Sequence, residues 1–253
     1  MAFLVILTVV LPILVAVLGL ALVQRLVDRG FREEHNDVSG NIYQVLGTTY
    51  AVLLAFVVLV VWEEYERAKD TVETEANELA GIYFLANRFS DSDRAQVHNL
   101  ARSYAQVVVE EEWPRMEEGK TSSRASALLS ELRASLQNLD ARTDTDLVLY
   151  DQALTRFHDL ANARRLRLVA ATEGMPGILW VVLLGGGMVT VGFTYLFGFK
   201  SNLAHALIIA ALTLVICSIL LTIGLFDYPF AGEVKVQPDA FQEVLRIFQE
   251  PGR

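Results

Sequence analysis

The chain has 253 residues, of which 53% are hydrophobic, and its formal net charge is −9. This hydrophobic content is typical of a membrane protein rather than of a soluble globular domain. The negative charge argues against a nucleic-acid partner, because nucleic-acid binding needs a basic surface against the phosphates.

Two long apolar runs open the chain, over residues 3–23 and 42–62, and neither contains a charged side chain. Each is long enough to cross a hydrocarbon core of about 30 Å as a helix. The first run lacks the charged start of a signal peptide, so we interpret it as a retained span. We therefore expect a first transmembrane pair in residues 1–62, with a polar loop at 24–41.

The loop ends in a polar stretch that leads directly into the second span. The stretch supplies the candidate pore-mouth residues, which are Glu33, Glu34, His35, Asn36 and Asp37. Its carboxylates and histidine would suit a cation, but no second histidine or cysteine stands at ligand spacing, so we predict no metal site. The simpler interpretation is a helix cap, with Asp37 or Ser39 as the N-cap of the second helix.

The second span carries small or neutral polar residues on one helix face. The candidate pore-lining residues step by three or four and are Gly40, Gln44, Thr48, Ala51 and Ala55. Such a row can line a narrow conduction path after oligomerisation. It can also be a packing seam, because small residues let membrane helices approach closely. The sequence leaves both interpretations open.

Residues 63–177 form an acidic region with 21 Asp and Glu and 14 Lys and Arg residues. No Gly or Pro lies between Thr48 and Gly81, so we expect the second span to continue as one helix to about Phe89. Apolar stripes in the rest of the region predict a soluble helical bundle that continues the second span.

Capping residues predict where three further helices of this bundle begin. The stretch 90–93 supplies N-cap chemistry for the first, Thr121 and Ser122 open the second, and the third begins near Thr143, each followed by an apolar stripe with helical spacing. We expect the acidic triplet at 110–112 to lie on a solvated face, since a row of glutamates is more often solvent-exposed than catalytic.

Two more apolar runs, over residues 178–199 and 203–226, predict a second transmembrane pair within 178–226. We expect two rows of small and hydroxyl-bearing residues to pack on each other. They are Gly186, Thr190, Thr194 and Gly198 in the first of these runs and Ala206, Ala210, Ser218 and Thr222 in the second. The tail at 227–253 should contain a short strand or extended segment around Val234 and Val236. After Pro238 we expect a short amphipathic helix, either at the membrane interface or against the bundle.

The predicted fold class is therefore an all-α membrane protein with four transmembrane helices, two plus two, and a helical-bundle insertion between the second and third. No Asp, Glu, Lys or Arg lies within a span, which disfavours coupled transport. We find no motif of an enzyme, and we expect no catalytic residue and no cofactor. Basic residues in the two short loops favour an outer-side location for the bundle and both termini.

Several stretches together resemble the bestrophin-like domain family of prokaryotic integral membrane proteins. They cover nearly the whole chain and are EHNDVSG, YAVLLAFVVLVVWEEYERA, ETEANELAGIY, EEEWPRM and DYPFAGEVKVQPDAF. The resemblance implies the two-plus-two layout and an ion channel. Bestrophins themselves are pentameric anion channels with a Phe-lined neck and an Arg-Phe-Pro motif. This sequence has no Arg-Phe-Pro, and Phe56 is the only phenylalanine of its second span.

Our first hypothesis is a homo-oligomeric ion channel in the bacterial inner membrane, with passive conduction along the second span and inorganic ions and the lipid bilayer as partners. The carboxylates of Glu33, Glu34 and Asp37 would enrich cations at the mouth, whereas the family resemblance implies anions. The alternative hypothesis is a non-conducting membrane scaffold or sensor that uses the bundle to bind a partner.

Overall fold

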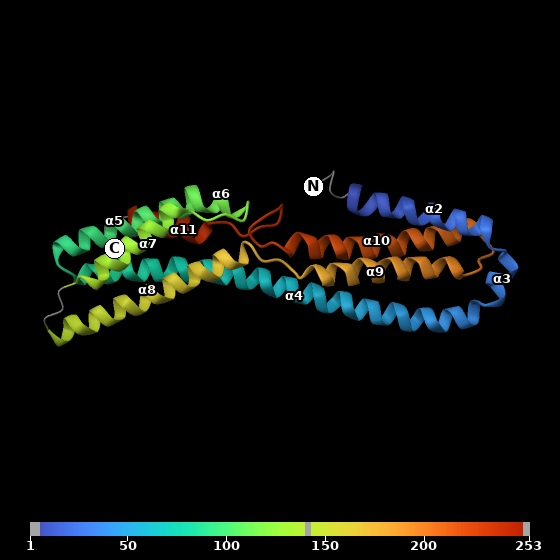
Figure 1. The fold of residues 1–253 in the computed structure, drawn as a ribbon, viewed down its shortest axis with the longest axis horizontal. Coiled ribbons are helices and arrows are strands. Elements are labelled where there is room, and N and C mark those ends of the chain that lie inside the picture. Colours follow the sequence, from blue (N-terminus) through green and yellow to red (C-terminus); the bar gives the residue numbers. More distant parts are fainter. Residues whose placement is uncertain (1–5, 140–142, 250–253) are drawn as a thin grey trace. The chain divides into compact units, whose positions relative to one another are not determined.

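The computed structural model describes residues 6–139 and 143–249, and the regular elements in those ranges are all helices (Figure 1). The predicted span residues 3–5 and tail residues 250–253 lie outside the described part. The chain divides into two compact units. The membrane unit comprises the described residues of Met1–Glu63 and Met175–Asp227, and the bundle unit comprises those of Glu64–Gly174 and Tyr228–Arg253.

The membrane unit contains four helices that are long and apolar enough to cross a membrane. The elements are η1 (Ile6–Val10), α2 (Leu11–Leu26), α3 (Arg29–Glu34), the first part of α4 (Asn36–Leu85), α9 (Gly177–Phe193), η4 (Thr194–Leu196) and α10 (Asn202–Phe226). Within this unit α10 packs against both α2 and α9 (Figure 1). The four predicted spans are confirmed, and α4 is a single helix of 50 residues, as the absence of Gly and Pro before Gly81 predicted.

The interior of the membrane unit is an apolar cluster between α4, α9 and α10. Its buried members step by three or four along α4 and meet one side of each neighbour; they are Tyr50, Leu54, Val57, Val61, Leu183, Ile216 and Ile223. A helix face with this spacing is a continuous stripe, so one side of α4 is fixed against the rest of the unit.

Tyr50 of α4 packs closely against α9. Its hydroxyl donates to the Leu183 carbonyl over 2.8 Å, and a Cβ placed on Gly186 would lie 2.6 Å from its ring. The small face of α9 therefore receives a tyrosine from α4, and the expected packing of that face on α10 was wrong in part. Ser218 and Thr222 of α10, which we expected in the same contact, are exposed.

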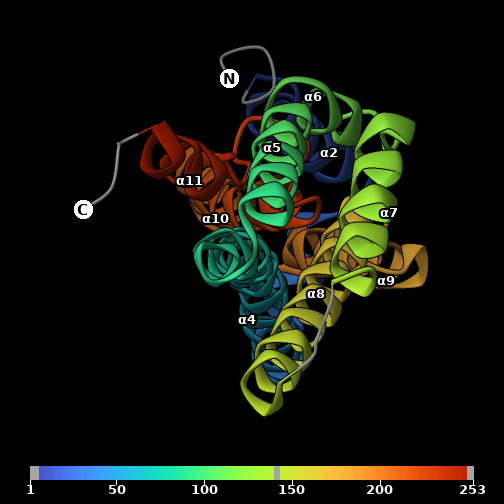
Figure 2. The same cartoon turned by 90° about the vertical axis from the view of Figure 1, so that its left-hand side faces the viewer.

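The bundle unit is built from the second part of α4 and seven further elements. They are η2 (Ala86–Arg88), α5 (Asp91–Val107), the π-helical η3 (Val108–Glu112), α6 (Trp113–Met116), α7 (Ser123–Gln137), α8 (Asp144–Ala170) and α11 (Asp239–Gln249). In the end view α5 lies between α7 and α11, and α7 also contacts α8 (Figure 2).

The three helices begin where they were expected, and each start has a side-chain cap. The side-chain oxygens of Ser90, Ser122 and Thr143 accept hydrogen bonds from backbone N–H groups three residues later, over 3.3, 3.2 and 3.1 Å. These bonds satisfy N–H groups that have no partner inside the helix, so each helix start is encoded locally.

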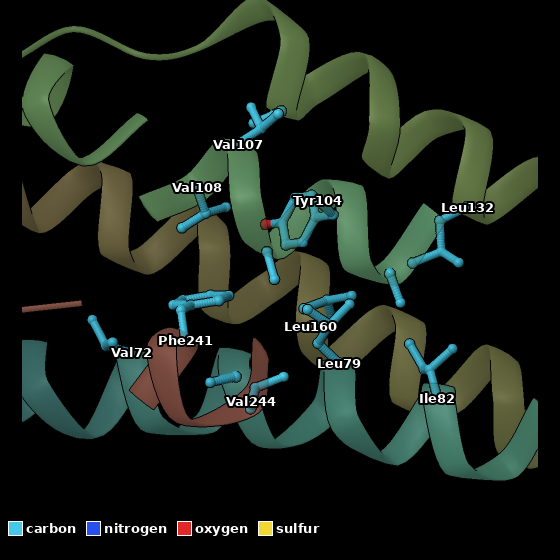
Figure 3. Close-up of a cluster of buried hydrophobic side chains, with 14 of the residues drawn as sticks. Val72, Leu79, Ile82, Tyr104, Val107, Val108, Leu132, Leu160, Phe241 and Val244 are labelled. Carbon is cyan, nitrogen blue, oxygen red and sulfur yellow. The ribbon is translucent and has the colours of Figure 1, made fainter. Parts of the chain in front are cut away.

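The bundle core joins side chains from every long helix of the unit (Figure 3). Val72 and Leu79 of α4 and Leu160 of α8 meet Phe241 of α11, and Phe241 is fully buried. Of the two positions left open for the last helix, the structure therefore selects the bundle. The segment before it is irregular rather than a strand, and its Val236 lies buried in the same core.

Candidate conduction path and buried charges

Within the membrane unit α4 presents a face that is largely exposed. Gln44, Thr48, Ala51 and Ala55 are exposed, and Gly40 is half-buried. They lie away from the stripe that holds α4 to α9 and α10. The row is left for water, lipid or a second copy.

An apolar groove runs beside this row. It has a volume of about 600 Å³ and is lined by Gly47, Ala51 and Ala55 of α4 together with Val215 and Ile219 of α10. Its wall offers almost no hydrogen-bonding groups, so it suits acyl chains or another helix rather than hydrated ions.

The carboxylates of the predicted mouth are exposed at the end of α4. Glu34 and Asp37 face solvent, and Glu33 pairs with Arg29 over 2.8 Å. The described residues contain no group of three or more His, Cys, Asp or Glu side chains arranged to hold a metal ion. These side chains therefore contribute surface charge rather than a ligand set.

The predicted cap of α4 was wrong. The helix already begins at Asn36, so Asp37 and Ser39 lie inside it, and the Ser39 N–H donates to the His35 carbonyl over 3.0 Å. Asp37 lies in the first turn of α4, where the helix dipole stabilises a negative charge. The residue that does cap a helix here is Asp28, whose carboxylate accepts the Gly30 N–H of α3 over 2.8 Å.

His35 and Asn36 have structural contacts. His35 Nδ1 lies 2.8 Å from the Phe31 carbonyl oxygen, within the loop itself. Asn36 donates to the Gly198 carbonyl over 3.0 Å and accepts from the Gly198 N–H over 2.9 Å. A Cβ on Gly198 would lie 2.5 Å from the Glu33 nitrogen, so only glycine permits this close approach. Asn36 of the predicted pore mouth is thus hydrogen-bonded to the turn after α9.

A second group of charges lies inside the bundle unit. Arg167 of α8 is fully buried and donates to both carboxylate oxygens of Glu75, over 2.6 and 2.9 Å. It also donates to Glu112 over 2.8 Å. Arg164 binds the other oxygen of Glu112 over 2.6 Å, and Tyr104 donates to Glu75 over 2.5 Å. We call these five residues the buried charge cluster.

The expectation that the 110–112 triplet is solvated was wrong for Glu112, which is 0% exposed. Burial alone would raise its pKa, but Arg167 and Arg164 more than offset that effect and hold the pKa of Glu112 below its ordinary 4.5. Burial also opposes the charge of Arg167, yet Glu75 raises the pKa of that guanidinium. Two carboxylates and two guanidinium groups then sum to zero charge.

Tyr104 remains protonated in this cluster. Burial raises the pKa of its phenol well above the ordinary value, and the negative charge of Glu75 raises it further. The hydroxyl therefore acts as a hydrogen-bond donor to Glu75, and the arrangement is a neutral, satisfied network rather than a poised acid or base.

The sequence did contain a signal for these missed residues. Glu75 follows Val72 by three positions, and Glu112 follows Val108 by four, so both occupy the apolar stripes of their own helices. A charged residue on a buried stripe predicts a buried partner. Arg164 and Arg167 share one face of α8 and carry the opposite sign.

Comparison with known proteins agrees with this architecture. The model of the Bestrophin-like domain family matches residues 10–241. A crystal structure of a point mutant of a bacterial Bestrophin homolog from Klebsiella pneumoniae superposes with a TM-score of 0.69 at 13% identity, covering 94% of this chain and 97% of that one. The same homolog solved by zinc phasing gives 0.69 at 12% identity, covering 94% and 96%. These identities establish a shared fold. No curated protein matches the chain by sequence.

Proposed function

Because the chain belongs to the Bestrophin-like domain family, we propose that it is a homo-oligomeric ion channel of the bacterial inner membrane in which α4 lines a passive path. The observation that supports this is the exposed row Gln44, Thr48, Ala51 and Ala55 on a helix apolar enough to span a membrane. The row is neutral, so it would offer dipoles to a passing ion without trapping it.

Oligomerisation follows from the cost of leaving this row in lipid. The Gln44 amide is exposed on α4, and hydrocarbon provides no partner for its two N–H donors and its carbonyl. Arranging several copies with this face toward a common axis would let water hydrate the amide. The packed stripe around Tyr50 would keep α9 and α10 on the outside of such a ring.

The test compares two neighbouring threonines of α4. Thr48 lies on the proposed lining, and Thr49 is also exposed but turned by about 100° and bonded to the Val45 carbonyl over 2.9 Å. In a Cys217→Ala background, a charged thiol reagent should reduce the planar-bilayer current of Thr48→Cys and leave that of Thr49→Cys unchanged. Equal effects on both would refute the assigned lining.

Absence of current from the purified protein, across several salts, would refute the channel itself. The remaining candidate would then be a non-conducting scaffold or sensor whose bundle unit binds a partner. An oligomer with no axial gap would support that second function, because a scaffold needs no path along α4.

The proposal also includes an orientation, with the bundle unit and both termini on the outer side. Short-loop basic residues Arg25, Arg29, Arg32 and Lys200 support it. In intact cells and without Cys217, an impermeant maleimide should label Glu118→Cys, on the exposed surface of the bundle unit, and spare Asn202→Cys. The opposite labelling pattern would invert the assignment.

A further inference from the structure

Arg32 of α3 is a buried arginine without a counter-charge. It is 5% exposed, and among the described residues its guanidinium donates only to the Phe197 carbonyl, over a long 3.4 Å. Its Nε is buried and has no hydrogen-bond partner. The contrast with Arg29, one turn earlier in the same helix, is clear: Arg29 is half-exposed and pairs with Glu33. A buried guanidinium without a counter-charge is unfavourable, so Arg32 is a candidate to bind an anion.

His205 completes the same environment. It is 1% exposed and lies in the first turn of α10. Its Nε2 lies 3.0 Å from the Thr194 carbonyl oxygen, and its Nδ1 is buried without a partner. Because a carbonyl only accepts, Nε2 carries the hydrogen, and Nδ1 is left to bind a proton or to accept a hydroxyl.

One short turn brings the two side chains together. Arg32 and His205 bind carbonyls of Phe197 and Thr194, three residues apart, and the charge of Arg32 acts on the His205 ring. The N-terminal end of α10 adds a positive dipole on the same side.

The carboxylates near this turn are engaged elsewhere or exposed. Asp28 caps α3, Glu33 pairs with Arg29, and Glu34 faces solvent. None of them lies within salt-bridge distance of Arg32 in the described residues. An external anion would therefore meet an uncompensated positive charge.

The free edge of the guanidinium indicates the class of anion. Nε and Nη2 of Arg32 donate to no described residue, and Nε is buried. Once the groups that cover Nε move aside, this planar edge matches two oxygens of a phosphate group. Nδ1 of His205 would take a proton or accept from a phosphate hydroxyl. We propose that Arg32 and His205 form a binding site for a phosphate group, from inorganic phosphate or from a lipid headgroup.

The experiment uses full-length protein stripped of lipid in a phosphate-free maltoside detergent. Thermal unfolding is followed while inorganic phosphate, or separately phosphatidic acid, is added, with chloride and diacylglycerol as matched controls. We expect one phosphate source to raise the midpoint in the wild type and in Arg29→Gln. In Arg32→Gln the dissociation constant should rise at least tenfold.

The two arms identify the source. A response to inorganic phosphate assigns a free anion, and a response only to phosphatidic acid assigns a lipid headgroup. If neither ligand shifts the wild type, or if Arg32→Gln binds as tightly as Arg29→Gln, the proposal is wrong. The same holds if the midpoint rises only with protein concentration, because a carboxylate of a second copy then fills the site.

Two further measurements keep the proposal testable if Arg32→Gln does not fold. Arg32→Lys retains the charge but loses the two-donor edge, so its affinity should fall several-fold while the protein stays folded. Native mass spectrometry of the wild type should show a phospholipid or phosphate adduct that is lost in Arg32→Lys. Equal adducts in both proteins would overturn the assignment.

Discussion

Replacing Arg167 by methionine should destabilise the bundle unit more than any change to a surface charge. The guanidinium is fully buried and makes two hydrogen bonds to Glu75 and one to Glu112. Methionine fills similar volume but leaves Glu75 with only the Tyr104 hydroxyl, while Arg164 still neutralises Glu112. Removing one partner of a buried pair costs about 3–5 kcal/mol, and the surviving contacts favour the lower end of that range.

A matched control is present on the same two helices. Arg156 of α8 pairs with Glu78 of α4 over 3.0 Å, and the Arg156 side chain is 44% exposed. Exposed pairs contribute about 0–1 kcal/mol. Arg156→Met should therefore leave the free energy of unfolding nearly unchanged.

The measurement is urea unfolding in detergent, followed by the fluorescence of Trp113, whose ring lies 5.4 Å from the Arg167 guanidinium carbon. Replacing Trp62 and Trp180 by phenylalanine in every variant leaves Trp113 as the only tryptophan, so the signal comes from the bundle unit. If Arg167→Met unfolds at the same urea concentration as Arg156→Met, the buried charge cluster does not stabilise the fold.

The pH dependence supplies a second criterion with a definite sign. The pKa of Glu112 in the folded chain lies below its ordinary 4.5. Its contribution to stability is therefore complete above about pH 4.5 and is lost as the pH falls through the lower, folded pKa. In Arg167→Met the pKa of Glu112 should rise, so the stability difference from the wild type should shrink below pH 4.5. A difference that stays constant down to pH 3 would contradict the assignment.

Three other changes test the remaining features. Gly186→Ala would place a Cβ 2.6 Å from the Tyr50 ring and should lower stability in detergent by about 1–3 kcal/mol, measured by thermal unfolding. A Cβ on Gly185 would meet no atom within 4 Å, so Gly185→Ala should leave stability unchanged, and equal losses in both variants would contradict the packing. Asp37→Asn should lower the cation-to-anion permeability ratio about twofold by reversal potential, and an unchanged potential would remove Asp37 from the mouth. Phe241→Ala should destabilise the bundle unit by about 3–5 kcal/mol in urea, since the side chain is fully buried; no loss would mean that α11 does not dock there.

The parts of the fold that the sequence predicts well depend on short-range chemistry. A cap such as Ser90 bonds a backbone group three residues away, and a charge-free run of 20 residues spans a bilayer regardless of its neighbours. The packing of α11 on the bundle could also have been predicted from the sequence. Phe241 and Phe248 are seven residues apart, which places them on one apolar side of a helix.

The features that were missed depend on contacts between distant residues. Arg32 is buried through contact with Phe197, 165 residues further along, and a six-residue helix is too short to show a periodic pattern around it. Glu112 did stand on the stripe of Val108, but the acidic triplet that contains it resembles a solvated face. The row at Gln44 was visible as a pattern, yet what it faces depends on contacts outside the single chain.

The buried charge cluster also sets an order of events during biosynthesis. Its members are far apart in the sequence, since Arg167 follows Glu75 by 92 positions and Glu112 by 55. The ribosome delivers both carboxylates before either arginine, so the nascent bundle holds two uncompensated negative charges until α8 emerges. Since Phe241 follows α9 and α10 in the chain, the core can close only after the last two spans have been made. The bundle unit therefore completes its core only after α9 and α10 have been synthesised.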